Sequence, residues 1–498
     1  MPGKPAHQEK SVSTYCYQCV AGPDLLKVRV EDGIATEVTP NFDAASVHPA
    51  GGKACVKAFG LVQKAYNPNR ILHPMKRTNP KKGRNEDPGF VRISWDEALD
   101  LVAEKLNAAR KAGLTDETGY PRVAASFGGG GTPTAYTGTL PAFLSAWGPV
   151  DMSFGSGQGV KCYHSEHLYG ELWHRGFTVS PDTPLCEYLV SFGANVEASG
   201  GVCGVKRHAD ARKRGMKRVQ VEPHLSVTGA CSAEWVPIRP KTDSAFMFAM
   251  IHVFLHENAR DKLDIPFLKD RTASPYLIGP NGFFMRDPVT RKPLLFDLKT
   301  QRAVAFDTPD TDPALEGSFT IDAIEVGADD EITEHKGISV SLAFAHLVEH
   351  VKTYSPEWAE KICDVPAATI RRISNEFLAH ARVGETIEIE GEILPLRPVS
   401  ISLGKTVNNG WGGYECCWAR TLIGCLVGAL EVPGSTLGTT VRLNRPADNR
   451  WSSVKPGPDG FMAYPMNPTG RNEWISRPPA TGWSAAPAAA REICRRGD

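Results

Sequence analysis

Long apolar segments, an excess charge of either sign and an export signal are all missing from this chain of 498 residues. Without a run of about 18 apolar residues, no membrane-spanning helix is expected. The first fifteen residues are polar and contain no twin-arginine pair, so we expect no signal peptide and a cytoplasmic protein. Basic and acidic residues number 56 each, which leaves no basic field to hold nucleic acid.

The length and the cysteine content set the broad class of the protein. Hydrophobic cores stop growing at about 250–300 residues, so a chain of this length predicts about three domains. Twelve cysteines without an export signal do not indicate a disulfide framework. We therefore expect the cysteines to bind metal or to lie buried as thiols.

Local patterns predict strands and helices in alternation. Residues 25–38 alternate apolar and polar side chains around Asp32-Gly33, which predicts a hairpin because this pair accepts positive φ angles. Ser94 precedes a helical pattern and has Glu97 three residues later, which is typical of a capping box. Further strands are expected at 122–127, 187–195 and 218–222, with a helix at 208–214.

This alternation predicts an α/β fold with parallel sheets. Residues from about 265 to 340 break the rhythm and predict an insertion with its own short strands. The α/β pattern returns at residues 343–350 and 356–380.

Cys16, Cys19 and Cys55 form a candidate metal site near the start of the chain. The two residues between Cys16 and Cys19 allow one loop to turn both thiolates toward one centre, and iron–sulfur clusters usually take four such ligands. Asp24 is a candidate fourth ligand. A three-cysteine zinc site with a nearby histidine such as His48, or unligated thiols, remain the alternatives.

A series of motifs resembles the DMSO-reductase family of molybdopterin oxidoreductases in its order along the chain. The opening segments are Cys16-x-x-Cys19, Cys55-Val-Lys57, Tyr66-Asn-Pro-Asn-Arg70, His73-Pro-Met-Lys-Arg77 and Ile93-Ser-Trp-Asp-Glu-Ala98. The later segments are Phe192-Gly-Ala-Asn-Val196, Val221-Glu-Pro-His224, Trp235 to Asp243, Ser355-Pro-Glu-Trp-Ala359 and Gly428 to Gly434.

The resemblance implies a multidomain fold of that family. Its parts would be a small N-terminal β domain for an iron–sulfur cluster at 10–76 and two Rossmann-like α/β domains. The first of these would be discontinuous, at 77–170 and 395–498, and the second would span 171–394. The family's C-terminal β-barrel cap domain has no counterpart in this sequence, so we expect a truncated chain.

The resemblance also implies two cofactors. They are a 4Fe-4S or 3Fe-4S cluster on Cys16, Cys19, Asp24 and Cys55, and a molybdenum bis(molybdopterin guanine dinucleotide). Pro23 occupies the position of a further family cysteine, which is why Asp24 becomes the candidate ligand. Tungsten in place of molybdenum is not distinguished by the sequence.

The segment Gly155 to His167 matches the family's metal-facing loop, which makes Cys162 the expected molybdenum ligand, with Ser165 as its rival. A soft thiolate suits this metal. The alternative is that Cys162 is a small buried apolar residue. His164 and His167 are candidate proton carriers in a substrate funnel.

A second set of residues is expected to bind the pterin dinucleotide. Lys57 matches the family lysine between cluster and pterin. The other candidates follow strand ends, where α/β folds bind nucleotides. They are Gly193, Asn195, Glu222, Pro223, Thr242 and Asp243.

The expected function is that of a catalytic subunit that performs oxygen-atom transfer or hydroxylation and passes electrons through the cluster. The opening cysteine segment and the loop around Cys162 look most like phenylacetyl-CoA:acceptor oxidoreductases, which form phenylglyoxylate. The alternatives are a tetrathionate, polysulfide or arsenate reductase, or a truncated cluster-binding polypeptide without catalysis. The resemblance implies an iron–sulfur electron-transfer subunit, together with a membrane quinone-interacting subunit, and it implies that this chain lies at the inner face of the membrane.

Overall fold

The computed structural model describes residues 8–16, 24–126, 143, 146–148, 150–153, 165–174, 178–327, 331–410, 412–439, 455–456 and 462–463. Cys19, Cys162 and His164 lie outside the described residues. The chain divides into two compact units. The first comprises Met1–Ser153 with Gly201–Cys203, and the second comprises Phe154–Gly200 with Gly204–Asp498.

The first unit begins with an antiparallel sheet of order β1-β2-β3. The predicted hairpin is confirmed, with Asp32 at φ +48° and Gly33 at φ +86° in its turn. The strands of the unit are β1 (Glu9–Tyr15), β2 (Leu25–Glu31), β3 (Ile34–Pro40), β4 (Met75–Arg77), β5 (Phe90–Arg92), β6 (Ala124–Ser126) and β7 (Asp151–Ser153). Its helices include η1 (Phe42–Ala44), η2 (Val56–Gly60), α1 (Leu61–Ala65) and α2 (Trp95–Lys111).

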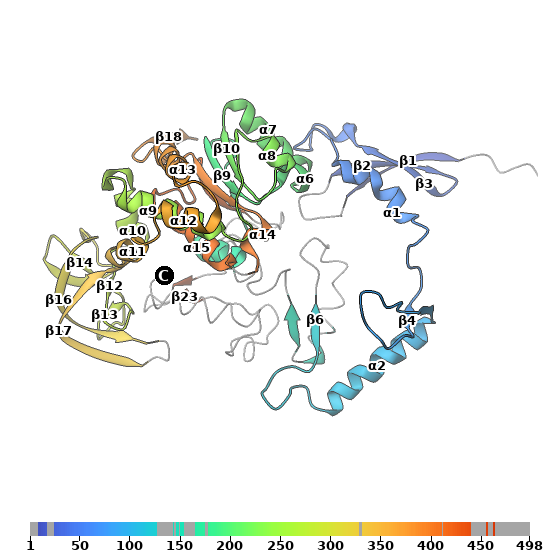
Figure 1. Ribbon diagram of the computed structural model, residues 1–498, viewed down its shortest axis with the longest axis horizontal. Coiled ribbons are helices and arrows are strands. Elements are labelled where there is room, and N and C mark those ends of the chain that lie inside the picture. Colours follow the sequence, from blue (N-terminus) through green and yellow to red (C-terminus); the bar gives the residue numbers. More distant parts are fainter. Residues whose placement is uncertain are drawn as a thin grey trace, which may run out of the picture. The chain divides into compact units, whose positions relative to one another are not determined.

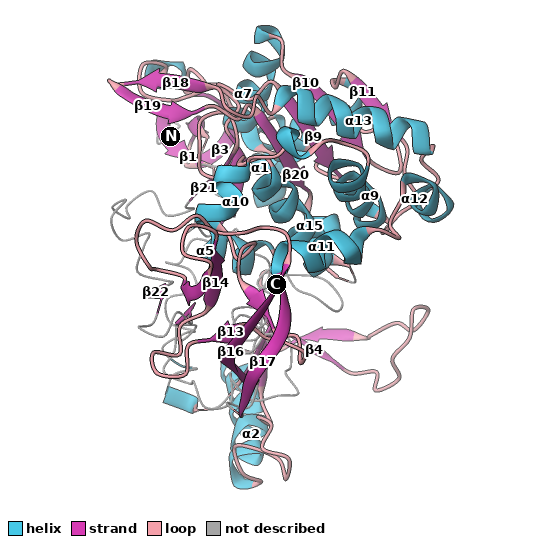
Figure 2. Ribbon diagram, turned by 90° about the vertical axis from the view of Figure 1, so that its left-hand side faces the viewer, coloured by secondary structure: helices cyan, strands magenta, loops and turns pink. Residues whose placement is uncertain are grey.

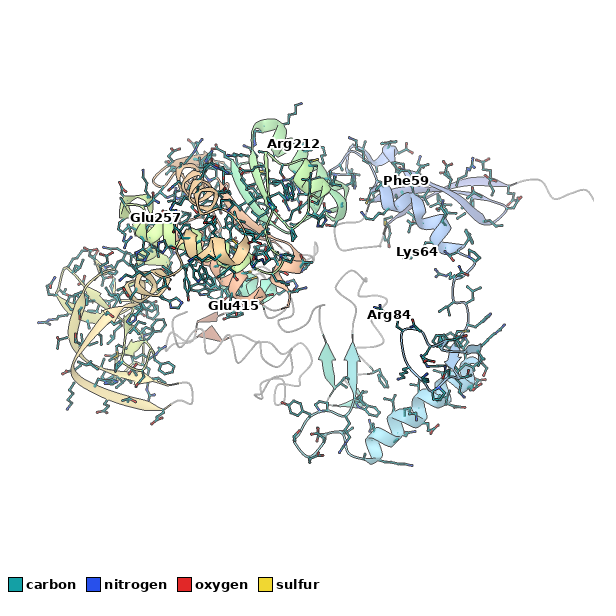
Figure 3. All side chains as sticks on the ribbon, in the orientation of Figure 1. Phe59, Lys64, Arg84, Arg212, Glu257 and Glu415 are labelled. Carbon is teal, nitrogen blue, oxygen red and sulfur yellow. The ribbon has the colours of Figure 1, made fainter. Side chains whose placement is uncertain are left out.

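The predicted start of α2 is also confirmed. Ser94 Oγ accepts a hydrogen bond of 3.0 Å from the Glu97 N–H, which satisfies one of the free amides of the first turn. The helix continues to Lys111, beyond the pattern seen in the sequence. None of its residues is buried, and Trp95 and Leu99 are exposed. Phe59, labelled in Figure 3, is another exposed apolar side chain of this unit.

The second unit is built around a parallel sheet of order β11-β10-β9-β20 (Figure 1). Its strands outside the insertion are β8 (Thr178–Pro181), β9 (Tyr188–Phe192), β10 (Lys217–Val221), β11 (Glu234–Val236), β18 (Thr386–Ile389), β19 (Glu392–Pro395), β20 (Val399–Leu403), β21 (Thr436–Thr439), β22 (Lys455–Pro456) and β23 (Met462–Ala463). Its helices include α5 (Glu166–His174), α6 (Val196–Ser199), α8 (Val227–Ala230), α9 (Asp243–His256), η4 (Arg260–Lys262), α10 (Ile265–Arg271), α11 (Ala343–Val351), α12 (Pro356–Cys363), α13 (Ala367–His380), α14 (Lys405–Asn408) and α15 (Gly413–Leu426). Helix α7 (Gly201–Arg214) also packs on this sheet.

Side chains of β9 alternate between the two faces of the sheet, as the period of two in a strand requires. Tyr188 and Phe192 join the main core, where their rings meet Phe377 of α13 and Phe246 of α9 at 6.3 and 5.5 Å. Leu189 packs on the other face against Ala211 of α7. Helices therefore cover both faces of the sheet (Figure 2).

The next strand, β10, places apolar side chains on one face and polar ones on the other. Val219 and Val221 belong to the main core, whereas Arg218 and Gln220 are buried on the opposite face. Buried polar groups require hydrogen-bond partners. The loops after β9 and β10 supply such partners, and their side chains form part of the candidate site.

The predicted insertion forms a β-rich lobe with its own core, drawn in yellow in Figure 1. Its main sheet has the order β12-β17-β16-β13. The strands are β12 (Leu277–Ile278), β13 (Met285–Arg286), β14 (Leu294–Asp297), β15 (Arg302–Ala305), β16 (Ser318–Val326) and β17 (Ile332–Leu342). The mixed α/β fold class expected from the sequence is thus confirmed. None of the helices in the described part of the chain has the length and apolarity to cross a membrane.

Candidate functional site

The carboxyl ends of β9, β10 and β20 meet at one edge of the sheet. Parallel α/β sheets bind ligands at this edge. Gly193 and Asn195 follow β9, Glu222 and Pro223 follow β10, and Gly404 follows β20. The structure therefore brings together four of the cofactor-binding candidates of the sequence: Gly193, Asn195, Glu222 and Pro223.

Two glycines allow the loops after β9 and β20 to touch. Gly193 has φ +62°, and a Cβ added to Gly404 would lie 2.2 Å from the Gly193 carbonyl oxygen. The Gly404 N–H donates to the Phe192 carbonyl at 2.7 Å. This contact leaves backbone, rather than side chains, along part of the ligand-binding edge.

Glu222 is 4 % exposed, and both of its carboxylate oxygens accept hydrogen bonds. Oε1 accepts from the Ser226 N–H at 2.8 Å, and Oε2 accepts from Gln220 Nε2 at 2.9 Å. Its carbonyl accepts from Trp235 Nε1 at 3.1 Å. The carboxylate is held in one orientation beside the end of β10.

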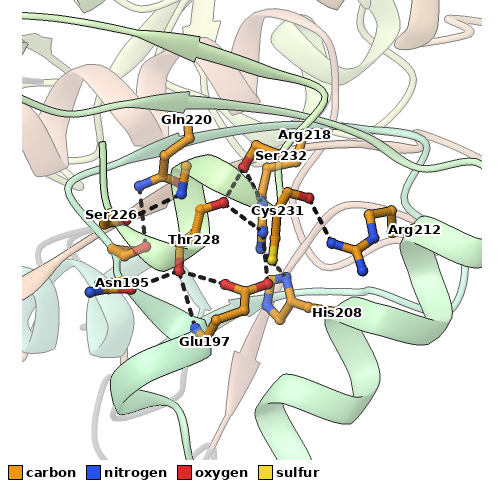
Figure 4. Close-up of polar contacts among 12 residues, drawn as sticks. Asn195, Glu197, His208, Arg212, Arg218, Gln220, Ser226, Thr228, Cys231 and Ser232 are labelled. Carbon is orange, nitrogen blue, oxygen red and sulfur yellow. Dashed lines mark hydrogen bonds and ion pairs between the residues drawn. The ribbon is translucent and has the colours of Figure 1, made fainter. Parts of the chain in front are cut away.

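Asn195 belongs to a polar network with side chains of α6, α7, α8 and β10 (Figure 4). Thr228 Oγ1 lies 3.0 Å from Asn195 Oδ1 and also contacts Glu197 Oε2 at 2.5 Å. Glu197 forms an enclosed ion pair of 2.7 Å with Arg218. Burial by itself raises the pKa of Glu197, but its hydrogen bonds with Arg218 and Thr228 outweigh this, so the pKa lies below its usual value. The network fixes the loop that carries Asn195.

Residues that follow β11 contact the segment after β20 at the same edge of the sheet. Lys241 Nζ donates to the Thr406 carbonyl and, at 2.5 Å, to the Asn409 carbonyl. Thr242 Oγ1 donates to the Arg239 carbonyl at 2.7 Å, so its proton is already committed to the backbone. Asp243 begins α9 and is 7 % exposed, and burial raises the pKa of its carboxyl group.

Three enclosed amide oxygens at this edge have no donor among the residues that the structure describes. They are Gln220 Oε1, Asn408 Oδ1 and Asn409 Oδ1. Buried acceptors without partners are costly, so these oxygens favour a ligand rich in N–H donors. The sequence did not single out these three residues. The signal for Asn408 and Asn409 was Gly404, which directly follows the alternating strand Val399–Leu403, and Gln220 had none.

The start of α5 lies close in the sequence to the expected metal ligand Cys162. Hydrogen bonds anchor it on α14. Ser165 Oγ donates to the Asn408 carbonyl, and Asn408 Nδ2 donates to Glu166 Oε2. His167 is 6 % exposed within the same helix. Cys162 and His164 themselves lie outside the described residues.

Helix α5 also borders a cavity of about 830 Å³ between α15, α11 and the β-rich lobe. Tyr169 and Trp173, which stack at 4.8 Å, form one wall, and Trp418 and Thr421 of α15 form another. The lining is mostly apolar and aromatic, as is common in pockets for organic ligands.

The N-terminal candidates Cys16, Asp24 and Cys55 lie together in the first unit. The Cys16 N–H donates to the Asp24 carbonyl at 2.8 Å, and the Cys55 N–H donates to Asp24 Oδ2 at 2.5 Å. Among the described residues, which do not include Cys19, no group of three or more metal-ligating side chains is assembled. Lys57 is exposed in η2.

Comparison with known proteins adds independent information. A family model described as molybdopterin oxidoreductase matches residues 70–450. A sulfite dehydrogenase subunit of Allochromatium vinosum is 25 % identical over 450 residues, which cover 84 % of this chain and 42 % of that protein. The molybdopterin-containing subunit of arsenate respiratory reductase from a Shewanella species is 26 % identical over 407 residues, covering 81 % and 40 %.

The solved structure of acetylene hydratase from Pelobacter acetylenicus is also similar, with a TM-score of 0.49 and 17 % identity over 85 % of this chain and 44 % of that one. This chain spans about two fifths of the length of the two curated relatives named above. The family model covers well over half of the sequence. The chain therefore belongs to the molybdopterin oxidoreductase family of enzymes.

Proposed function

We propose that this chain is the cofactor-binding part of the catalytic subunit of a molybdenum oxidoreductase. Its reaction is a two-electron oxygen-atom transfer or hydroxylation. The observation that carries the proposal is the ligand edge of the parallel sheet, with its backbone-lined glycine contact and three enclosed amide oxygens without donors among the described residues.

The residues at this edge fit a molybdopterin guanine dinucleotide. Pterin and guanine rings both carry N–H donors, which complement Gln220, Asn408 and Asn409. Gly193 and Pro223 shape the backbone of the edge, and Asn195 and Asp243 line it. Thr242 Oγ1, whose proton is donated to the Arg239 carbonyl, would accept a hydrogen bond from the cofactor there. When bound, the cofactor supplies the two-electron chemistry, while the protein supplies position and electrostatics.

Cys162 is proposed as the protein ligand of the molybdenum, with Ser165 as the alternative. Support comes from the anchoring of Ser165 and Glu166 on α14, at the same edge of the sheet. His164 and His167 are proposed to move protons close to the metal. This assignment predicts that Cys162→Ser keeps the pterin nucleotide but changes the molybdenum EPR signal.

Cys16, Cys19, Asp24 and Cys55 are proposed to hold an iron–sulfur cluster, with Lys57 beside it. The contact of Asp24 with the Cys55 amide supports this choice of fourth ligand, because a carboxylate has two oxygens and can accept a hydrogen bond while ligating. Asp24→Ala is expected to lower the iron content and alter the cluster EPR spectrum. An unchanged spectrum would remove Asp24 from the ligand set, and Asp43→Ala, at an exposed carboxylate, is the control.

Two substrate classes are proposed. The aromatic lining of the cavity favours an aryl substrate such as phenylacetyl-CoA, oxidised to phenylglyoxylate. The names of the relatives, a sulfite dehydrogenase and an arsenate respiratory reductase, favour an inorganic oxyanion such as arsenate. Tetrathionate and polysulfide are further candidates that we propose in the same inorganic class. Dye-coupled assays with phenylacetyl-CoA and with arsenate on the same preparation decide between the two classes.

The central test is the cofactor content of the purified full chain. We expect molybdenum and a guanine nucleotide in a stoichiometric ratio, together with iron. Asn195→Ala should lower the molybdenum content, whereas Asn258→Ala, whose side-chain amide donates to the Val253 carbonyl away from this edge, should not. Zinc without molybdenum or iron would contradict the proposal. The proposed partners, to be sought by co-purification, are an electron-transfer subunit together with a membrane subunit.

A further inference from the structure

The cavity of about 830 Å³ in the second unit has walls from two different parts of the fold. Helix α15 contributes Trp418, Leu422 and Cys425, which recur at helical spacing and therefore share one face of the helix. The β-rich lobe contributes Tyr276 and Phe306. The insertion that interrupts the α/β pattern therefore helps to enclose the cavity.

The aromatic side chains of these walls are held in place by contacts with other rings. The Tyr276 ring meets the rings of Phe284 and Phe306 at centroid distances of 5.1 and 6.0 Å. Tyr169 of α5 stacks on Trp173 at 4.8 Å. Side chains that are ordered before binding lose little conformational freedom when a ligand arrives. The cavity is thus preformed for a flat apolar group, and its aromatic walls favour an aromatic ring.

The described residues that line the cavity offer no charge in its interior. Apart from two histidines, Asp270 and Arg271 are the only acidic or basic residues among them. These two side chains pair with each other at 2.7 Å and are 70 % and 71 % exposed, so they lie at the rim. Burial raises the pKa of Cys425 and that of Tyr276 to about 12, which keeps the thiol and the phenol neutral. An oxyanion inside the cavity would lose its hydration without gaining a counter-charge.

The polar groups of the lining define the other end of a suitable ligand. His346 and His350 lie four residues apart on α11 and are exposed at the rim. Tyr276 is half-buried, and its hydroxyl has no hydrogen-bond partner among the described residues. The protonated phenol can therefore donate a hydrogen bond to a ligand. A ligand that fits this lining has a flat ring for the interior and a polar group that accepts a hydrogen bond.

Helix α5 connects the cavity to the ligand edge of the sheet. Ser165 and Glu166, at the start of this helix, are anchored on Asn408 at that edge. Tyr169 lines the cavity one turn later, about 6 Å along the helix axis. The wall of the cavity therefore lies close to the edge where the cofactor is proposed to bind.

We propose that this cavity binds the aromatic ring of an organic substrate, that Trp418, Tyr276 and Phe306 select the ring, and that the β-rich lobe confers this specificity. The cavity rejects inorganic oxyanions, because its described lining places no cation in the interior. The role of the ring as part of a substrate rests on the proposed function. Binding of the ring to the chain does not depend on it.

The first test measures the binding of phenylacetamide, an uncharged probe with a benzene ring and an amide group, to the purified full chain by calorimetry. One saturable site with a Kd in the millimolar range or below is expected for a ligand of this size. Trp418→Ala should raise this Kd about tenfold or more, since an aromatic contact and its buried area are lost. Trp418→Phe keeps a ring and should retain most of the affinity.

A second variant leaves the packing of the cavity intact. Tyr276→Phe removes only the hydroxyl group, so the ring contacts with Phe284 and Phe306 are kept. The Kd for phenylacetamide should rise about two- to tenfold through the loss of one hydrogen bond.

A matched pair of variants tests the place of binding. Ala343 and Ala345 are both half-buried in the first turn of α11, but only Ala343 lines the cavity. Ala343→Trp fills part of the cavity and should abolish the binding of phenylacetamide. Ala345→Trp places the same side chain elsewhere on the helix and should leave the Kd unchanged. Circular dichroism of both variants establishes that they are folded.

Three results overturn the proposal. They are the absence of saturable binding to the native chain in the millimolar range, equal binding by the native chain and Ala343→Trp, and displacement of phenylacetamide by arsenate at equal ionic strength. All three can be obtained from protein without molybdenum. Absence of molybdenum from every preparation would contradict the proposed function alone.

The role of the ring as part of a substrate is tested on protein that contains molybdenum. Ala343→Trp should keep its metal content and lose the turnover of phenylacetyl-CoA. Turnover by this variant at the native rate would overturn the substrate role, whatever the result of the binding measurements.

Discussion

Asp264 and Arg397 form a buried ion pair in the second unit whose charges are both fully compensated by hydrogen bonds. Asp264 Oδ2 lies 2.7 Å from Arg397 Nη2, and Asp264 Oδ1 also accepts the Phe267 N–H at the start of α10. The pair joins residues 133 positions apart, so it ties α10 to the strand that enters the sheet. The pair stabilises the fold because both charges are fully hydrogen-bonded. Removing one partner would leave an uncompensated buried charge.

Asp264→Ala is therefore expected to lower the free energy of unfolding by about 3–5 kcal/mol. The measurement is urea denaturation followed by tryptophan fluorescence. Glu316→Ala is the control, since its ion pair with Arg260 is exposed and should contribute only about 0–1 kcal/mol. Equal losses in the two variants would show that burial does not decide the strength of these pairs.

His208 gives the second prediction at the level of single residues. Burial and the neighbouring charge of Arg218 lower the pKa of His208 to about 4. The unfolded chain, with an ordinary imidazole pKa of about 6.5, binds more protons than the folded chain between these two values. Stability should therefore fall as the pH decreases from about 6.5 to about 4.

The contribution of His208 is isolated by comparing the native chain with His208→Gln. Between pH 6.5 and pH 4 the native chain should lose on the order of 2–3 kcal/mol more than the variant. Denaturation curves at a series of pH values measure the difference. Parallel pH profiles would mean that His208 is protonated in the fold without cost.

At the scale of elements, the contact between the ends of β9 and β20 depends on Gly404. A Cβ there would lie 2.2, 2.5 and 2.8 Å from Gly193 O, Gly193 C and Ala194 N, which are all backbone atoms. Gly404→Ala must shift one of the two strand ends, at a cost of about 1–3 kcal/mol. We expect this variant to lose most of its molybdenum, measured as metal per chain.

Gly204→Ala is the matched control for this variant. Gly204 lies inside α7, and the nearest atom to an added Cβ is Val196 Cγ1 at 3.9 Å, an ordinary contact. Alanine favours a helix over glycine by about 1 kcal/mol, so this variant should be slightly stabilised and keep its metal. Loss of metal in both variants would contradict the role given to the Gly404 contact.

At the scale of the whole molecule, the two units differ in how much apolar surface they enclose. Helix α9 of the second unit has eleven buried residues, whereas α2 of the first unit has none. Local opening requires less free energy where few apolar contacts are lost. Hydrogen exchange followed by mass spectrometry should therefore show the slowest exchange in α9 and much faster exchange in α2. Equal protection of α2 would indicate that another surface covers its apolar side chains.

The sequence by itself determined the local elements and the family. The Asp32-Gly33 hairpin, the Ser94 cap and the alternation of strands and helices depend on neighbouring residues, whose φ preferences and side-chain periods act within one element. The ordered motifs from Cys16 to Gly434 indicated the molybdopterin family, which the match over residues 70–450 confirms. The three-domain division and the ligand residues stay predictions.

Only the tertiary structure decided which side chains share the ligand edge and which buried charges are compensated. Glu166 and Asn408 are 242 positions apart, and no local pattern predicts their contact. Gln220 and Arg420 look in the sequence like ordinary strand and helix residues, yet both carry enclosed polar atoms without partners among the described residues. Compensation of a buried group depends on elements brought together by packing over long loops, and that information is absent from any short window of sequence.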